Sequence, residues 1–461
     1  MAPTATPTVT LTPTQKPTPT PAPLQTFTPS PSPTATPIPI VAAQPSLEVQ
    51  SLSNGLKVIV YEDHTAPVVS VNVWYRVGSR NELVGNRGLA HLMEHMMFKG
   101  STNFGPDEHA QIIDRAGGVG NAFTSEDATG YWDKVPLEKF ELALELEAER
   151  MHNLVLTQEN LDSEREVVKE EFRTRIENDP ISAAFETFRA LAFEGTPYAW
   201  APVGTLDDID GITLSDLSNF YETYYAPNNA VLVVAGDVTA EGVFELAQDH
   251  FGAIPRAMAP PILSVELAEQ AGFREETLEM AVQLPAVIGG YTIPGVGHED
   301  LPALEVIQFI LSAGESSRMN RSLVREQRLA VFAGGFALTF KDLGSMLIVA
   351  FFTPDKDPTQ IKDALLGEIE RLRAAPVAQE ELQKAKNQLT AQYIFNLDSL
   401  SGVADSIGEA EVVWGDYRLF LEAQERYNDL SVADIQDVAQ RYFIDEGLTL
   451  VTLKPEQETQ P

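Results

Sequence analysis

The sequence contains no cysteine, which excludes disulfides and means that any metal site must do without thiolate ligands. Cationic residues are also scarce, with 32 Lys and Arg against 67 Asp and Glu, for a formal net charge of −35. Nucleic-acid-binding proteins usually have the opposite balance, so we expect no nucleic-acid partner. No apolar run reaches the roughly 18 residues of a membrane-spanning helix, so no transmembrane span is predicted.

The first 46 residues lack the apolar residues needed for a core. Residues 2–39 are dominated by Pro, Thr, Ala and Ser and carry one charged residue, Lys16. This composition predicts an extended, disordered linker over residues 1–46. It resembles the tethers of secreted domains, so we expect an extracytoplasmic protein, secreted or tethered to a bacterial cell envelope. Because the segment has no basic or apolar region of a signal peptide, we expect a signal or lipoprotein leader to have preceded it.

The rest of the chain is long enough for more than one hydrophobic core. We predict an N-terminal domain at 47–256, a linker at 257–270 that begins with Ala-Met-Ala-Pro-Pro, and a C-terminal domain at 271–461. Runs of Val and Ile predict strands at 56–61, 68–75 and 230–236. Helical periodicity is present at about 137–154 and 159–176. The predicted fold class is therefore α+β, with antiparallel or mixed sheets and helices packed on them.

The second half of the chain repeats the first. Residues 157–161 resemble residues 378–382, an offset of 221 (from 157 to 378), and residues 214–225 resemble 432–443. A duplicated α+β unit is the simplest interpretation. The second copy has no His-x-x-Glu-His motif, and Gln392 stands where the offset would put the counterpart of Glu171. We therefore expect one metal site per chain, in the first copy.

The most informative motif is the His-x-x-Glu-His string formed by His91, Glu94 and His95. On the predicted helix, positions i, i+3 and i+4 lie on one face. Two histidines one turn apart can hold one Zn²⁺, and the glutamate is placed to take a proton from a water molecule there. This inverted zincin arrangement indicates a metallopeptidase. The alternative is an amphipathic core helix, but three ionisable groups are costly to bury without a partner such as a metal.

A catalytic zinc needs a third protein ligand, because such sites have three ligands and one open position. Glu164 and Glu171 are seven positions apart in a predicted helix and therefore lie two turns apart on one face. We expect Val167 and Val168 on the same face to point toward the core. Both carboxylates are thus predicted to point inward, whereas the neighbouring glutamates should be solvated.

Several motifs together resemble the insulinase/pitrilysin family, most closely its processing-peptidase-like branch. They are His91-Leu-Met-Glu-His with Phe98-Lys-Gly, Gly117-Gly with Asn121-Ala-Phe-Thr-Ser, Glu164-Arg-Glu-Val-Val-Lys-Glu-Glu171, and Tyr225-Ala-Pro-Asn-Asn through Gly236-Asp237. The resemblance covers about residues 47–455. It implies two homologous α/β-sandwich-like repeats that form half of a clamshell chamber.

The resemblance also implies roles for individual residues. His91, His95 and Glu171 match the ligands of one Zn²⁺ per chain, and Glu94 matches the general base. Glu164 matches a second carboxylate that supports the site from the outer shell.

The resemblance further implies how a peptide binds. Asn121 and Ala122 fall in an edge strand to which a peptide substrate adds as an extra strand. Phe98 and Phe123 are candidate substrate-binding residues beside them.

The sequence departs from the family in its second half. The family carries an Arg and a Tyr there, but this chain has Arg328-Leu-Ala-Val331 where the family has Gly-Leu-Ala-Tyr. Arg325 could be the surviving arginine, although its register is one residue off. We therefore expect a heterodimer with a paralogous Arg/Tyr-bearing subunit, with a homodimer left open.

The predicted function is a zinc-dependent endopeptidase that acts on short or unfolded peptides. Two alternatives remain on the same fold: a non-catalytic structural subunit, and a peptide-binding protein that is slow without its partner. Other conspicuous residues are given structural roles. Arg80 and Glu82 lie in a turn before the metal helix, and His109 and His152 are expected to be solvated on surface helices.

Overall fold

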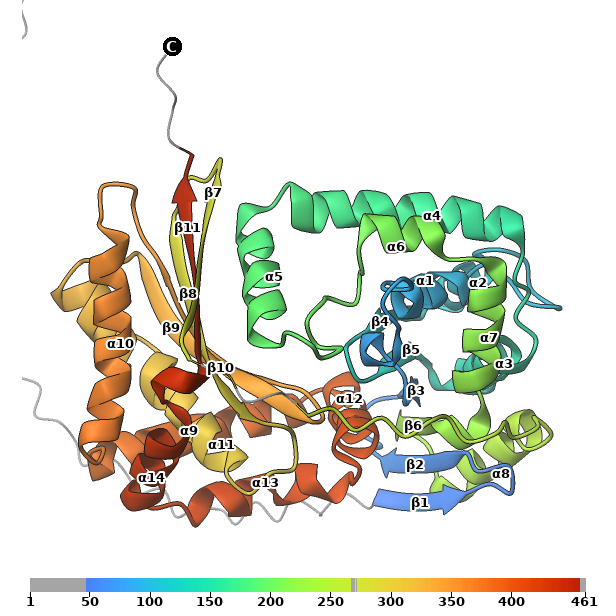
Figure 1. The fold of residues 1–461 in the computed structure, drawn as a ribbon. Coiled ribbons are helices and arrows are strands. Elements are labelled where there is room, and N and C mark those ends of the chain that lie inside the picture. Colours follow the sequence, from blue (N-terminus) through green and yellow to red (C-terminus); the bar gives the residue numbers. More distant parts are fainter. Residues whose placement is uncertain (1–46, 267–269, 271, 457–461) are drawn as a thin grey trace, which may run out of the picture. The chain divides into compact units, whose positions relative to one another are not determined.

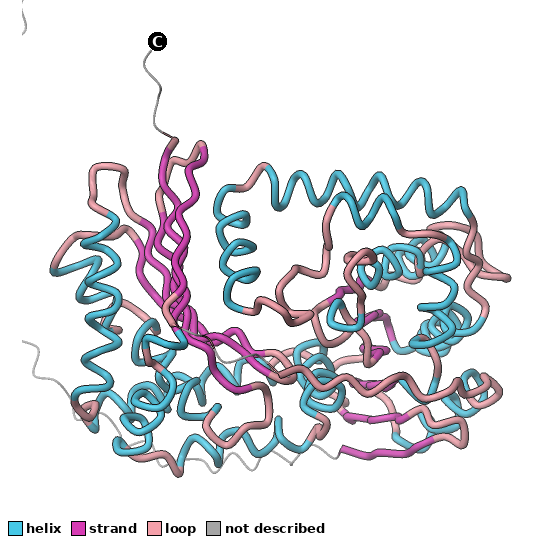
Figure 2. The backbone as a smooth tube through the Cα atoms, viewed as in Figure 1, coloured by secondary structure: helices cyan, strands magenta, loops and turns pink. Residues whose placement is uncertain are grey.

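The computed structural model describes residues 47–266, 270 and 272–456. The predicted linker 1–46 and part of the predicted linker 257–270 lie outside the described residues. In the described part, the strands form two separate sheets with helices packed on them (Figures 1 and 2). The predicted α+β fold class is confirmed, while the exact domain boundaries stay a prediction.

The first sheet is built by residues before position 237 and has the order β1-β2-β6-β3-β5-β4. Its strands are β1 (Leu47–Ser51), β2 (Lys57–Glu62), β3 (Val68–Tyr75), β4 (Val119–Thr124), β5 (Thr129–Pro136) and β6 (Ala230–Gly236). The strands β3 and β6 are runs of β-branched residues that are buried almost throughout. β4 pairs with β5 through a short turn and forms one edge of the sheet.

The second sheet repeats this topology. It has the order β7-β11-β8-β10-β9, with β7 (Arg274–Met280), β8 (Ala286–Pro294), β9 (Phe332–Thr339), β10 (Leu343–Phe351) and β11 (Leu448–Pro455). The parallel pair β7–β11 corresponds to β2–β6, and the edge hairpin β9–β10 corresponds to β4–β5. The shared topology agrees with the duplication predicted from the sequence.

The helices follow the same two-fold pattern. In the first half they are α1 (Leu89–Met96), α2 (Glu108–Arg115), α3 (Phe140–His152), α4 (Gln158–Phe172), α5 (Pro180–Ala192), α6 (Leu206–Gly211), α7 (Leu214–Tyr224) and α8 (Ala240–Phe251). In the second half they are α9 (Leu301–Ser312), α10 (Pro358–Ala374), α11 (Gln379–Leu397), α12 (Leu400–Glu409), α13 (Arg418–Asn428) and α14 (Val432–Tyr442). Helices α4 and α11 begin 221 positions apart, as the sequence repeat predicts.

Each half contributes one helix that packs on the sheet of the other half. Helix α5 packs on β8 and β11 (Figure 1), while α12 packs on β3 and β6. In both contacts an aromatic ring lies against a glycine: Phe188 of α5 against Gly290, and Trp74 of β3 against Gly408 of α12. A methyl group on either glycine would overlap the facing ring. The two halves therefore share parts of their packed interiors.

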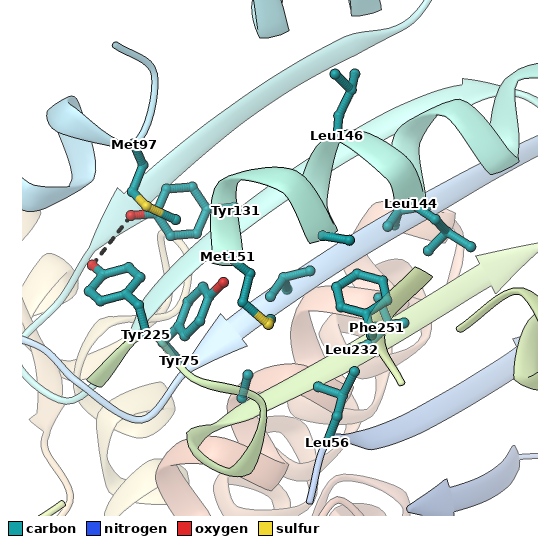
Figure 3. Close-up of a cluster of buried hydrophobic side chains, with 14 of the residues drawn as sticks. Leu56, Tyr75, Met97, Tyr131, Leu144, Leu146, Met151, Tyr225, Leu232 and Phe251 are labelled. Carbon is teal, nitrogen blue, oxygen red and sulfur yellow. Dashed lines mark hydrogen bonds between the residues drawn. The ribbon is translucent and has the colours of Figure 1, made fainter. Parts of the chain in front are cut away.

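The core of the first half lies between the sheet and α1, α3 and α8. Figure 3 shows part of it, where Tyr75, Tyr131 and Tyr225 gather beside Met97 and Met151. Helix α1 enters this core through three residues that are fully buried, Leu92, Met93 and Met96. Their burial fixes which face of α1 points away from the core. No helix in the described part of the chain is long and apolar enough to cross a membrane.

Candidate metal centre

Helix α1 is held at its N-terminus by a buried carboxylate. Glu82 accepts hydrogen bonds from the backbone N–H groups of Gly88 (3.0 Å) and Ala90 (2.8 Å), and from Trp200 Nε1 (3.1 Å). An acidic side chain at this position satisfies free N–H groups of the first turn and, when ionised, is attracted to the positive end of the helix dipole. Burial raises the pKa of Glu82 to about 8 although these three donors favour the ionised form. The turn predicted to be merely structural therefore positions helix α1, which carries the His-x-x-Glu-His motif.

Helix α4 begins at a threonine cap, where the Thr157 side chain accepts from Asn160 N. The buried stripe of the helix is Leu161, Glu164 and Val168. The prediction for Val167 is wrong, because this side chain is 47% exposed. The stripe steps by three and then four positions, so residue 167 falls just outside it.

The two helices bring the predicted ligands together. His91 Nε2 lies 3.8 Å and His95 Nε2 lies 3.6 Å from Glu171 Oε2. One potential ligand atom from each of the three residues lies within 4.8 Å of the other two. Glu171 is in the last turn of α4, just before the π-helix Arg173–Glu177, and its other oxygen forms an ion pair with Arg175 Nη2 at 2.7 Å. Such π-helical segments are frequent at functional sites.

This donor set suits a zinc ion. Two imidazole nitrogens and one carboxylate oxygen are a known ligand set of catalytic zinc sites, and they converge here from one side. Glu164 Oε2 lies 3.2 Å from His95 Nδ1, and Lys99 Nζ lies 3.1 Å from Glu164 Oε1. Glu164 thereby orients one histidine in the way that outer-shell carboxylates do. His91 has no such support among the described residues, because its Nδ1 is buried without a hydrogen-bond partner.

The electrostatics of the cluster favour one bound positive charge. Burial disfavours the charged form of His95, but the neighbouring carboxylates of Glu164 and Glu171 outweigh this and raise the pKa of His95 to about 9. Burial and the neighbouring His95 lower the pKa of His91 to about 4. The neighbouring His95 lowers the pKa of Glu171. The two carboxylates thus stabilise a positive charge on His95. A metal cation held by the three side chains would place its positive charge at the same position.

Glu94 is the fourth residue of the motif and lies beside the cluster. Thr124, at the end of β4, donates its hydroxyl hydrogen to Glu94 Oε2 at 2.6 Å. Burial raises the pKa of Glu94, which makes its carboxylate a better proton acceptor. The sequence did not single out Thr124, although it lies within the Asn-Ala-Phe-Thr-Ser segment.

The predicted peptide-binding segment is the outer edge of β4. Asn121 is exposed, Ala122 packs against the core of the first half, and Phe123 contacts Trp74 on the other face with ring centroids 4.9 Å apart. Within the described residues, β4 pairs only with β5, so one side of its backbone lacks a strand partner. The substrate-binding roles of these residues stay predictions.

The other two candidate substrate-binding residues lie in different surroundings. Phe98 is half-buried below α1, where Arg150 lies over its ring at 5.2 Å. Arg325 is exposed in the second half and pairs with Glu315 of the same half. Among the described residues it makes no ion pair or hydrogen bond with the first half.

The prediction that His109 is solvated is wrong. Its side chain is 8% exposed, and its Nε2 lies 3.0 Å from Asp133 Oδ2. Glu147 and Arg150 form a second buried pair next to it. His109, Asp133 and Glu147 are close enough to hold a metal, but each carboxylate already has a partner, so we assign this cluster a structural role.

Comparisons with known proteins agree with these features. The family described as Insulinase (Peptidase family M16) matches residues 57–204, and the Peptidase M16 inactive domain matches residues 211–389. The zinc protease PqqE of Helicobacter pylori is 36% identical over 415 residues, which cover 89% of this chain and 93% of that protein. The mitochondrial-processing peptidase subunit beta of Lentinula edodes is 28% identical, over 88% of this chain and 89% of that protein.

A solved structure shows the same relationship in three dimensions. The crystal structure of a protease from Helicobacter pylori matches with a TM-score of 0.86 at 36% identity, covering 89% of this chain and 100% of that chain. On this evidence the chain belongs to the insulinase family of peptidases, peptidase family M16.

Proposed function

We propose that the chain is the zinc-bearing subunit of an endopeptidase that cleaves short or unfolded peptides bound along β4. The observation that carries this proposal is the convergence of His91 Nε2, His95 Nε2 and a Glu171 oxygen from two helices. A purely structural subunit has no use for this arrangement. Relatives named zinc proteases support the same conclusion.

In this proposal His91, His95 and Glu171 hold one Zn²⁺. The zinc, when bound, supplies Lewis acidity that activates water and polarises a peptide carbonyl. Glu94 accepts a proton from the attacking water and returns it to the leaving amine. Thr124 holds one Glu94 oxygen, which leaves the other oxygen free for this exchange.

The free backbone edge of β4 supports the way in which a peptide would bind. An extended peptide can add there as an extra strand through main-chain hydrogen bonds. Such binding favours unfolded segments and makes few demands on side chains. The net charge of −35 would attract cationic peptides from solution.

The proposal includes a second subunit. Val331, where the family has its tyrosine, is 53% exposed just before the edge strand β9. A paralogous partner that brings the Arg and Tyr would complete the site, and a homodimer is the alternative. The relatives include subunits named mitochondrial-processing peptidase subunit beta, which supports a paired arrangement. We also propose an extracytoplasmic location, from the composition of residues 1–46.

The test is cleavage of unstructured basic peptides by the purified, zinc-loaded chain, with products read by mass spectrometry. The chain is assayed alone and with a paralogous subunit, before and after chelation of the metal. Cleavage that needs zinc, in either format, supports the proposal. Peptide binding without cleavage in both formats contradicts it and favours a binding role.

A further inference from the structure

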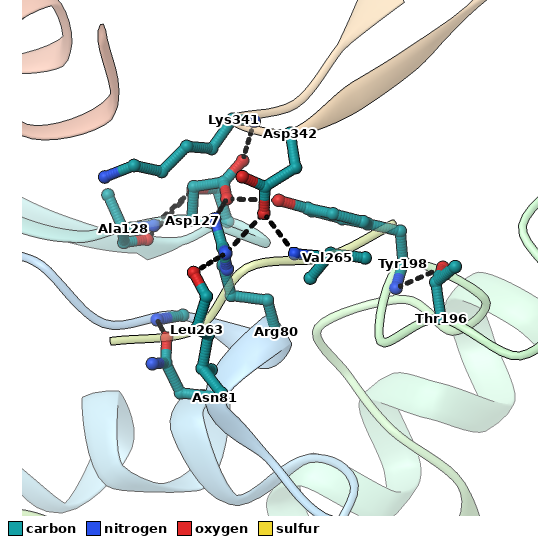
Figure 4. Close-up of polar contacts among 12 residues, drawn as sticks. Arg80, Asn81, Asp127, Ala128, Thr196, Tyr198, Leu263, Val265, Lys341 and Asp342 are labelled. Carbon is teal, nitrogen blue, oxygen red and sulfur yellow. Dashed lines mark hydrogen bonds and ion pairs between the residues drawn. The ribbon is translucent and has the colours of Figure 1, made fainter. Parts of the chain in front are cut away.

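Arg80 is a buried arginine that joins the two halves of the chain. Its side chain is 5% exposed, and its two terminal nitrogens bind two aspartates, Nη1 to Asp127 Oδ1 at 2.9 Å and Nη2 to Asp342 Oδ2 at 2.5 Å (Figure 4). Nη2 also donates to the Leu263 carbonyl at 3.1 Å, in the segment between the halves. The guanidinium lies over the Tyr198 ring at 5.6 Å. Both terminal nitrogens of the guanidinium are thus engaged.

The two aspartates occupy equivalent places in the duplicated fold. Asp127 lies in the turn between β4 and β5, which is closed by Ser125 N bonding to Ala128 O at 2.8 Å. Asp342 lies in the turn between β9 and β10, which is closed in the same way by Phe340 N and Leu343 O at 2.8 Å. Each aspartate is the third residue of its turn. One arginine therefore ties together the matching edge-hairpin turns of both repeats.

The two turns also contact each other directly. The Asp127 carboxylate also accepts from the backbone N–H of Lys341, in the other turn, at 2.9 Å, and from the Tyr198 hydroxyl at 2.8 Å (Figure 4). Asp342 further accepts from Val265 N at 3.3 Å. An arginine fork can satisfy two carboxylates at once, whereas a lysine ammonium cannot reproduce its planar geometry.

The first of these turns leads directly to the candidate site. Thr124, which binds Glu94, is three positions before Asp127. The same hairpin carries β4, the strand proposed to bind the peptide. A displaced turn would move both the peptide-binding edge and the residue that holds Glu94.

We propose that Arg80 and Asp342 are positioning residues through which the second half holds the peptide-binding hairpin of the first half in its productive position. This inference rests on the proposed function. It gives the second half, which has lost the metal ligands, a direct part in the reaction. Because misplacement by a fraction of an ångström already weakens catalysis, the effect should appear without any change in metal binding.

The test compares Asp342→Asn with Glu381→Gln as a matched control. Glu381 binds Arg318 through both oxygens in the second half, and its side chain is 28% exposed against 22% for Asp342. Both changes remove the charge of a partly exposed carboxylate that pairs with an arginine. Only Asp342 belongs to the contacts between the two hairpin turns. Zinc content, peptide hydrolysis and amide hydrogen exchange are measured on both full-length variants.

We expect Asp342→Asn to lower kcat/KM on the order of tenfold and to speed exchange across residues 119–128, with zinc content unchanged. Glu381→Gln should leave all three near wild type. Arg80→Lys keeps the buried charge and should show the same effects as Asp342→Asn. It replaces Asp342→Asn in the test if Asp342→Asn folds poorly. Unchanged exchange and hydrolysis in the variants would overturn the inference. A wild type that is inactive both alone and with the paralogous subunit would instead refute the proposed function, while the exchange measurement would still test whether Arg80 and Asp342 hold the hairpin in place.

Discussion

Glu164 Oε2 lies 3.2 Å from Nδ1 of His95, so the second ring nitrogen of that histidine faces Glu171. With a metal bound, His95 would donate its Nδ1–H to Glu164 and present the lone pair of Nε2 to the metal. Lys99 Nζ lies 3.1 Å from the other Glu164 oxygen, and His95 together with Lys99 lowers the pKa of this carboxylate. In the proposed site the two glutamates of α4 would therefore do different work, because Glu164 would orient a ligand and Glu171 would supply one.

We predict that Glu164→Gln weakens zinc binding by about 10–100-fold, which is typical for loss of an outer-shell carboxylate. The amide would no longer accept from His95 and Lys99 with the strength of a charged group. Competition with a chelator of known affinity measures the change. Glu166→Gln, on the exposed face of the same helix, is the control and should keep the affinity of the wild type.

Glu94→Gln should lower the rate of peptide hydrolysis by several orders of magnitude while zinc stays bound. The amide cannot accept a proton, but it keeps the size of the side chain and its contact with Thr124. Hydrolysis rate and zinc content are measured on the same preparation. Normal cleavage by this variant would show that Glu94 is not the base.

The aromatic–glycine contact between the halves gives a stability prediction. Gly408→Ala should destabilise the protein by roughly 1–3 kcal/mol, because the added methyl overlaps the Trp74 ring and forces repacking. Gly367→Ala, in the middle of α10 with open space around it, should stabilise by about 0.5–1 kcal/mol. Chemical denaturation of both variants checks the pair, and a stabilising Gly408→Ala would contradict the packing described.

The buried Glu82 should make stability depend on pH. Its pKa is about 8 in the folded protein against 4.5 for an ordinary glutamate. Between these values the unfolded chain releases the proton and the folded chain keeps it, so the free energy of unfolding falls as pH rises. Glu82→Gln should remove this part of the slope. The difference between the two stability curves from pH 4.5 to 8 is the measurement, and parallel curves would contradict the assignment.

The sequence predicted the parts of the structure that depend on local pattern. The spacing of His91, Glu94 and His95 predicted that they share one face of a helix. The separation of seven positions predicted that Glu164 and Glu171 share one face of a second helix. The segments matched at an offset of 221, residues 157–161 and 378–382, both lie at the start of a helix, in α4 and α11. These features follow from helical periodicity and need no knowledge of tertiary contacts.

The sequence could not predict which polar residues meet across long distances. His109 was expected on the surface because its partner is far away in the sequence. It pairs with Asp133 of β5 only when α2 packs against the sheet, and no local pattern shows this. Arg80 and Glu82 share a short turn, yet one binds the hairpins of both halves and the other caps α1. No local sequence pattern shows that α5 packs on the second sheet and α12 on the first.

Metal content is the most direct test of the central claim that His91, His95 and Glu171 form a zinc site. Native mass spectrometry or elemental analysis of the zinc-reconstituted chain is run beside Glu171→Gln and Glu170→Gln. Glu170 is the adjacent, exposed residue and pairs only with Arg173 among the described residues. We predict about one zinc per chain in the wild type and in Glu170→Gln, and a large loss in Glu171→Gln. No zinc in the wild type, or full zinc in Glu171→Gln, would contradict the account.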